Sequence, residues 1–248
     1  MSRAHVLAAA LALCASLPST ALGAPRTSMT AAFAPNRLGA QTTLSLGFRI
    51  ASGGDDAPPP LTGLDFHFPV NLGLATSGLG VASCPIAPLE QHGPTVCPPD
   101  SRMGSGSARV EIPVGGGIQT ETASIALLAG PSENGYVKLL ITATGLSPVI
   151  ARVVIPSLLR PGDFNLDVPL VESLPGAADV SIVEVHMTLG GNLTYYETVR
   201  GRTVPYRPAG IGLPRTCPRG GFPFSSTFTF VGGTRRDATT RVACPRGG

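Results

Sequence analysis

Hydrophobic and polar residues alternate along much of this chain. Between Leu44 and Ile50, leucine, phenylalanine and isoleucine occupy every second position, with Ser45 and Arg49 on the opposite face. This period of two is what a strand with one buried face requires. The same alternation, or a more continuous apolar run typical of central strands, recurs in segments 64–68, 108–112, 136–144, 149–155, 183–189, 222–230 and 238–243.

Helix signals are few. Segment 118–128 is the best candidate, but its Thr and Ile content and its flanking glycines favour a strand. Glycine and proline pairs such as Gly53-Gly54 and Pro161-Gly162 recur as turn signals. About a dozen short strands separated by turns predict an all-β fold, an antiparallel β-sandwich or a jelly-roll-like arrangement stapled by disulfides.

The amino-terminal residues predict an export signal. Arg3 precedes an apolar run at 6–13, and small residues follow up to Ala21-Leu22-Gly23. This order is that of a secretory signal peptide, so we expect residues 1–23 to be removed and the protein to be secreted or associated with the cell envelope. A lipid anchor on Cys14 is the alternative. No later stretch is long and apolar enough for a transmembrane helix.

The remaining chain has two possible organisations. Residues 24–36 show no apolar period, so they predict a flexible N-terminal arm. Residues 37–248 then form one β-sandwich domain, or two sandwiches divided near 175–177. Gly and Pro number 31 and 25, Trp is absent and aromatic residues make up 5%, so the core must use aliphatic side chains and a few Phe.

Four cysteines remain after the signal: Cys84, Cys97, Cys217 and Cys244. An even number in an exported chain predicts two disulfides. Three pairings are possible, and proximity in sequence favours Cys84–Cys97 and Cys217–Cys244. A metal site is not expected, because no Cys-x-x-Cys pair occurs and His92 has no second ligand nearby in sequence.

Charge is distributed unevenly. From Arg200 onward the chain carries nine Arg and one acid, whereas 24–199 carries eight basic and fourteen acidic residues. The two segments either neutralise each other in one fold or present a cationic face for an anionic envelope polymer or polysaccharide. Nucleic acid is not an expected partner of an exported protein. The candidate binding residues are Arg235, Arg236, Arg241, Tyr195 and Tyr196.

Local catalytic motifs are missing from the sequence. It contains no P-loop, no dinucleotide-binding glycine pattern, no Gly-x-Ser-x-Gly elbow and no His-Glu-x-x-His helix, and no cofactor is expected. A triad assembled from distant residues stays open. Weaker constellations are a calcium-type Asp163, Asn165, Asp167 series, and the acid–histidine pairs at 184/186 and 65/67. Each is more typical of the polar face of a strand.

Several segments resemble an uncharacterised family of exported, Ala-, Gly- and Pro-rich proteins from GC-rich bacteria. The chain has 17 Arg against the single Lys138, which is typical of GC-rich codon usage. The resemblance implies export and the cysteine framework, and no activity. The segments that carry it are Pro35–Ala40, Thr76–Gly80, Cys97-Pro98, Ser101–Gly104, Leu189–Tyr196 and Cys217–Gly221.

Three functions therefore stay open. The leading hypothesis is an exported, non-catalytic structural or surface-associated β-sandwich protein. The alternatives are a binding module for an anionic envelope polymer or polysaccharide, which requires the arginines on one exposed face, and an extracellular hydrolase on a jelly-roll scaffold. The hydrolase requires His67 or His186 in a cleft beside a carboxylate.

Overall fold

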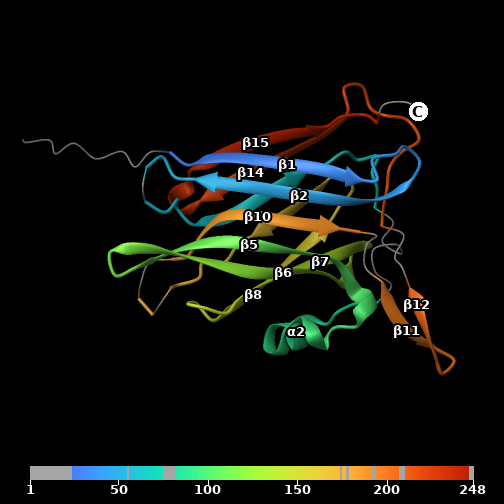
Figure 1. Ribbon diagram of the computed structural model, residues 1–248, viewed down its shortest axis with the longest axis horizontal. Coiled ribbons are helices and arrows are strands. Elements are labelled where there is room, and N and C mark those ends of the chain that lie inside the picture. The colour runs from blue at the N-terminus through green and yellow to red at the C-terminus, as the bar shows by residue number, and fades with distance from the viewer. Residues whose placement is uncertain are drawn as a thin grey trace, which may run out of the picture.

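The computed structural model describes residues 24–245 except 55, 75–81, 174, 177–178, 191–193 and 207–209. The expected signal peptide, residues 1–23, lies outside this range. Strands make up 60% of the structure and helices 8%, and the sheets are antiparallel and packed together. The predicted all-β, sandwich-like fold is therefore confirmed (Figure 1).

The larger sheet contains nine strands within the described residues. Its strand order is β4-β13-β2-β10-β5-β6-β7-β8. The ninth strand, β1, lies outside this order and also pairs with β2. Segment 118–128 lies in a strand, as its composition predicts. The strands are β1 Arg26–Ala34, β2 Gln41–Ala51, β4 Gly73–Leu74, β5 Arg102–Val114, β6 Gly117–Glu133, β7 Tyr136–Gly145, β8 Ala151–Leu159, β10 Ser181–Leu189 and β13 Ile211–Gly212.

The smaller sheet has the order β15-β14-β3-β9 and packs against the larger one. A two-stranded hairpin, β11–β12, stands away from both sheets, and a helical segment covers part of the large sheet near β6 and β7 (Figure 1). These elements are β3 Leu61–His67, β9 Asp163–Asp167, β14 Phe222–Phe230, β15 Arg235–Val242, β11 Tyr195–Val199, β12 Arg202–Tyr206, α2 Ile86–His92, η1 Pro94–Val96, η2 Pro99–Ser101 and η3 Val231–Gly233.

All nine phenylalanines of the chain lie in, or pack against, one core between the two sheets. Strand β14 contributes four of them, because its inward positions alternate as Phe222, Phe224, Ser226, Phe228 and Phe230. Rings cross the layer: Phe33 of β1 lies 5.3 Å from Phe222, and Phe48 of β2 lies 5.3 Å from Phe228. Edge-to-face contacts of this kind add to the energy of apolar burial.

The sides of the sandwich are closed by contacts between edge strands. On one side β1 lies beside β15, where Thr27 Oγ1 donates to Asp237 O at 3.2 Å (Figure 1). On the other side β8 turns into β9, and Ser157 Oγ donates to Asn165 O at 2.6 Å. Edge strands facing each other leave fewer backbone groups open to pairing with another chain.

The prediction of a loose N-terminal arm at 24–36 is wrong. Strand β1 pairs with β2 from Arg26–Ala51 to Ala34–Thr43, and it buries Met29 and Phe33 in the core. The alternation is present in the sequence, but alanines on both faces hide it. The division near 175–177 does not match the sheets either, since both sheets draw strands from both sides of it.

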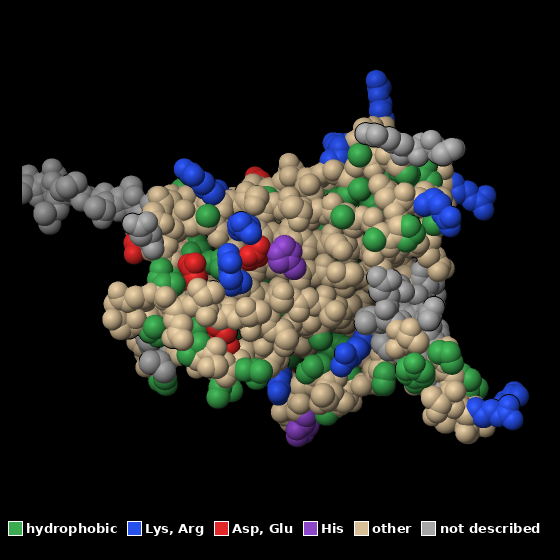
Figure 2. Space-filling model, viewed as in Figure 1, with side chains coloured by type: hydrophobic (Ala, Val, Ile, Leu, Met, Phe, Trp, Pro, Cys, Tyr) green, Lys and Arg blue, Asp and Glu red, His purple; other side chains and the backbone are tan. Residues whose placement is uncertain are grey.

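The outer face of the large sheet is polar, with small residues and a few charged side chains at its centre. Figure 2 views this face, where basic, acidic and histidine side chains gather over its middle strands. The underlying cause is the strand period of two, which sends every second residue away from the core. Its central residues are Ser45, Gly47 and Arg49 of β2, Glu184, His186 and Thr188 of β10, and Ser105, Ser107 and Arg109 of β5.

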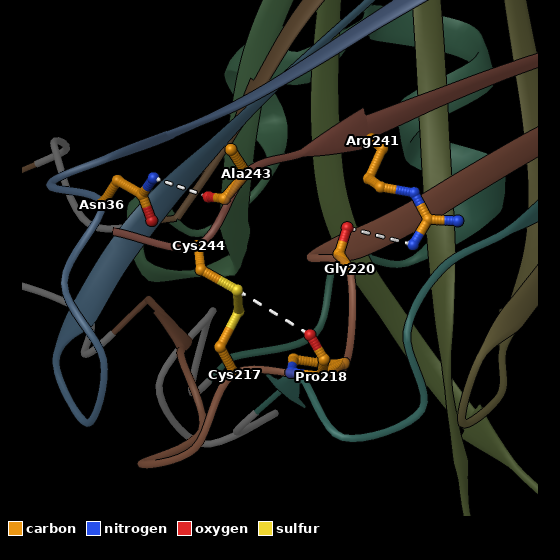
Figure 3. The surroundings of a disulfide bond; sticks show 7 residues. All are labelled: Asn36, Cys217, Pro218, Gly220, Arg241, Ala243 and Cys244. Atoms are coloured by element: carbon orange, nitrogen blue, oxygen red, sulfur yellow. Dashed lines mark hydrogen bonds between the residues drawn. A yellow bond between two sulfur atoms is a disulfide. The ribbon is translucent and has the colours of Figure 1, made fainter. Parts of the chain in front are cut away.

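The two disulfides are Cys84–Cys97 and Cys217–Cys244, the pairing favoured by proximity in sequence. The first holds the segment of α2 and η1 against Leu128 and Leu140 on the large sheet. The second ties the residues before β14 to the end of β15, and Figure 3 shows its surroundings. There Asn36 Nδ2 donates to Ala243 O at 3.2 Å, which links the same region to the β1–β2 connection.

Truncating Phe228 tests the shared aromatic core. We expect Phe228→Ala to lower the free energy of unfolding by about 3–5 kcal/mol, because it removes a buried ring and leaves a cavity. Val231, just beyond the same strand, is 43% exposed and gives the matched control. Val231→Ala should change the stability by less than about 0.5 kcal/mol in urea denaturation. Equal losses in the two variants would contradict this core.

Removing the second disulfide tests the covalent closure. Cys217 and Cys244 are 27 residues apart in sequence. Loop entropy then predicts that replacing both by serine lowers the free energy of unfolding by about 3.5 kcal/mol. Urea denaturation of the oxidised wild type and of the double variant measures the difference. A double variant as stable as the wild type would show that this bond contributes nothing to the fold.

Candidate functional site

The three candidate arginines of β15 do not form one exposed face. Arg235 and Arg241 are exposed on the outer side of the strand, whereas Arg236 is half-buried on the other side. Arg235 Nη2 lies 3.2 Å from Asp65 Oδ2, an acid of the preceding acidic segment, and Arg236 Nε donates to Pro25 O at 3.2 Å. Arg241 Nη1 donates to Gly220 O at 3.1 Å, beside the disulfide (Figure 3).

The other described arginines of this basic segment lie in two places. Arg215 and Arg219 lie on the connection around Cys217, and Arg219 precedes Gly220, to which Arg241 donates. Arg200 and Arg202 belong to the turn and second strand of the β11–β12 hairpin, far along the molecule from β15 (Figure 1). Figure 2 shows several basic side chains at the upper right of the molecule and others at the lower right and over the middle of the left half. The three candidate arginines of β15 are therefore not gathered on one face, although Arg241 has Arg219 nearby at the disulfide.

The tyrosines of the candidate site lie on the protruding hairpin. Tyr195 pairs with Tyr206 and Tyr196 pairs with Pro205 across β11 and β12. Tyr196 is 68% exposed, so it is not part of the core. The side chains of Tyr195 and Tyr206 lie outside the described part of the structure.

The calcium-type series lies on β9, where the Asn165 side chain is engaged in the small sheet and Asp163 Oδ1 is buried without a hydrogen-bond partner. Asn165 Nδ2 donates to Asp65 Oδ1 at 2.8 Å, and Asp65 also pairs with Arg235. Across the described ranges, no group of three or more His, Cys, Asp or Glu side chains is arranged to hold a metal ion. The Asp65 carboxylate is thus shared between Asn165 and Arg235 and does not orient His67, which is exposed.

Glu184 is the centre of a charged cluster on the outer face of the large sheet. Strand register places Arg49 of β2 and Arg109 of β5 on either side of it. Arg49 Nη2 lies 2.6 Å from Glu184 Oε1, and Arg109 Nη2 lies 3.1 Å from Oε2. His186 Nε2 lies 3.0 Å from Oε1, so the predicted acid–histidine pair is formed.

These partners change the acidity of Glu184. The hydrogen bond from Arg49, then that from His186, together with the positive charges of both arginines, lower the pKa of Glu184 to about 2. The carboxylate is therefore ionised at neutral pH, accepts hydrogen bonds from Arg49 and His186, and forms an ion pair with Arg109. Its role is to neutralise two cations on a sheet face.

A shallow notch lies beside this cluster. Thr30, Gly47 and His186 are neighbours in register across β1, β2 and β10. A methyl group on Gly47 would lie 2.8 Å from Thr30 Oγ1 and 3.0 Å from His186 Nδ1, so glycine leaves the space between them open. The His186 imidazole is bonded to the Glu184 carboxylate and lies across this space from the Thr30 hydroxyl. The His186 side chain is nevertheless 65% exposed, and this face of the sheet is open.

The second candidate site is an apolar pocket inside one end of the sandwich. Its volume is about 110 Å³, and it lies between the inner face of β5–β8 and β10 and the segment 168–171. Its floor consists of small residues: Ala108 pairs with Ala123, and Gly145 pairs with Ala151. Where other parts of the core have Phe or Leu, these side chains leave space.

Glu121 is the single ionisable residue among the described residues that line the pocket. Although it is only 6% exposed, its carboxylate is satisfied by the turn between β7 and β8. Leu146 N and Ser147 N donate to Oε1 at 2.7 and 2.9 Å, and Val149 N donates to Oε2 at 3.1 Å. A methyl group on Gly145 would lie 2.7 Å from Oε1, so glycine is needed there.

Sequence reasoning missed both the pocket and the role of Glu121. The sequence contains a signal for each, since alanine stands at inward positions of three neighbouring strands and Glu121 interrupts an inward alternation. Neither signal identifies a pocket by itself, because only the register shows that the alanines are neighbours. Arg49 and Arg109 were likewise not recognisable as partners of Glu184.

No family model, no curated protein and no solved structure matches this chain. Within the described residues, no helix is long and apolar enough to cross a membrane. The resemblance to an exported bacterial family stays a prediction.

The depressed pKa of Glu184 predicts a dependence of stability on pH. Its pKa of about 2 in the folded protein lies below the ordinary glutamate value of 4.5, so the ion pairs stabilise the fold above pH 4.5 and are lost as the pH falls toward 2. The stability difference between the wild type and Glu184→Gln should therefore shrink over that interval in urea denaturation. Glu90→Gln, at an exposed position of α2 away from this cluster, is the control, and its stability difference from the wild type should stay the same over this interval. A stability difference between the wild type and Glu184→Gln that stays constant with pH would contradict the ion pairs of Glu184.

Proposed function

We propose that this protein is an exported, non-catalytic β-sandwich that acts as a structural or surface-associated component at the cell envelope. The observation that carries the proposal is the closed, cross-linked architecture. Both sides of the sandwich are sealed by edge-to-edge contacts, and two disulfides fasten its connections. Disulfides persist in oxidising compartments, which agrees with export.

The charged side chains support the same proposal. Glu184 neutralises Arg49 and Arg109, and Asp65 is bonded to Asn165 and Arg235, so these groups are used within the sheets. Catalytic groups are usually aimed into a cleft with perturbed titration. Here His67, His92 and His186 are each exposed, whereas the hydrolase alternative requires one of them in a cleft; His186, although bonded to the Glu184 carboxylate, lies at a shallow notch on an open face.

Polymer binding through a cationic face receives no support from the arrangement of the three candidate arginines of β15. Arg235 is bonded to an acid and Arg236 is half-buried, so the three candidates do not combine into one surface. Polymer binding through charge would weaken as the salt concentration rises.

Fractionation of the producing cells tests the proposal. The tagged full chain should be found, with its cysteines oxidised, in the envelope fraction, and it should stay there through a salt series up to about 1 M, where charge interactions are largely screened. The double variant Arg235→Ser, Arg241→Ser should sediment like the wild type. Release by salt, or loss of association in that variant, would favour polymer binding instead. Retention in the cytosol with free thiols would overturn the proposal.

A further inference from the structure

The apolar pocket at the β5–β8 end of the sandwich has the features of a ligand site. Protein interiors rarely keep voids much larger than a water molecule. This pocket has about 110 Å³, and side chains of Ala, Val, Leu, Ile and Pro make up nearly all of its lining. An apolar cavity of about 150 Å³ in another protein stays dry and binds benzene. The volume here suits a group of similar or slightly smaller size.

Exposed apolar residues occur close to the pocket along the chain. Leu170 of the lining is 47% exposed, and Leu146 and Ile150, on the β7–β8 turn next to the lining residues Gly145 and Val149, are 74% and 87% exposed. The turn that carries Leu146 and Ile150 is held in place by the three hydrogen bonds to Glu121. Exposed apolar residues next to an apolar pocket are typical of a surface that contacts a ligand extending beyond the pocket.

Charge determines which apolar ligands fit. The lining contains one carboxylate, Glu121, and no basic residue among its described members. The nearest basic residues along the strands turn away: Arg152 Nη1 donates to Gln91 O at 3.3 Å near α2, and Arg109 pairs with Glu184 on the outer face. An anionic group in the pocket would therefore be desolvated beside a carboxylate without a cation to pair with it.

We propose that this pocket binds a small uncharged apolar molecule, or the uncharged alkyl or single-ring end of a larger one. Ala108, Ala123 and Ala151 provide the flat floor, and Val110, Val153 and Ile182 line its walls. Glu121 fixes the entrance turn and disfavours any ligand whose anionic group would enter the pocket. Ligand binding in this pocket does not require that the protein acts at the cell envelope.

A matched pair of ligands tests the proposal on the purified, oxidised full chain. 1-Hexanol and hexanoate have the same alkyl length and differ in charge. In a methyl NMR titration, hexanol should shift the signals of Val110, Val153 and Ile182 and leave those of Val242 unchanged. We expect hexanoate to bind at least about tenfold more weakly, because its charge is not paired. Glu121→Gln should bring the affinity for hexanoate closer to the affinity for hexanol.

Filling the pocket provides the second arm. Ala123→Leu places a larger side chain on the floor and should weaken hexanol binding at least about tenfold, by occupying the same space. Thr122→Leu, the next residue on the exposed outer face, is the control and should bind hexanol like the wild type. If Ala123→Leu fails to fold, the wild-type titration decides. Hexanoate binding as tightly as hexanol, or no shift of the lining methyl signals at saturating hexanol, would overturn the proposal.

Discussion

The packing of phenylalanine rings between the two sheets is the constraint on which the remaining structure depends. The chain has no tryptophan, and its nine phenylalanines converge on one layer. Strand β14 supplies four of them and meets Phe33 of β1 and Phe48 of β2 across the layer. The first and last parts of the sandwich are thereby held together, which explains why residues expected to be loose form a buried edge strand.

The distribution of side-chain size within the same layer produces the pocket. Near β1, β2 and β14 the space between the sheets is filled by rings, whereas alanines stand at neighbouring positions of β5–β8. Two sheets keep a nearly constant separation, so small residues on one side leave space that the other side does not fill. Because the opposing segment 168–171 is a connection and not a strand, this space opens to the end of the sandwich.

The electrostatics follow from strand register. Glu184 neutralises two arginines from neighbouring strands, and Asp65 joins Asn165 and Arg235 across the small sheet. The acidic and basic segments of the chain thus meet at least at Asp65 and Arg235. The buried Glu121 has a different role, since its hydrogen bonds are all to backbone N–H groups of one turn. It organises the entrance of the pocket without a charged partner.

The sequence by itself determined the fold class and most of the strands, and it favoured the cysteine pairing that the structure shows. The period of two is a local property, and cysteines 13 and 27 residues apart are close enough along the chain to suggest their partners. The sequence also indicated the Glu184–His186 pair, whose members share one strand face. Only the tertiary structure decided that Arg49 and Arg109 flank Glu184, that Arg235 is bonded to Asp65, and that Ala108 lies beside Ala123 in a pocket floor. Each of these depends on which strands are neighbours and in what register, and residues distant in sequence carry no local signal of that choice.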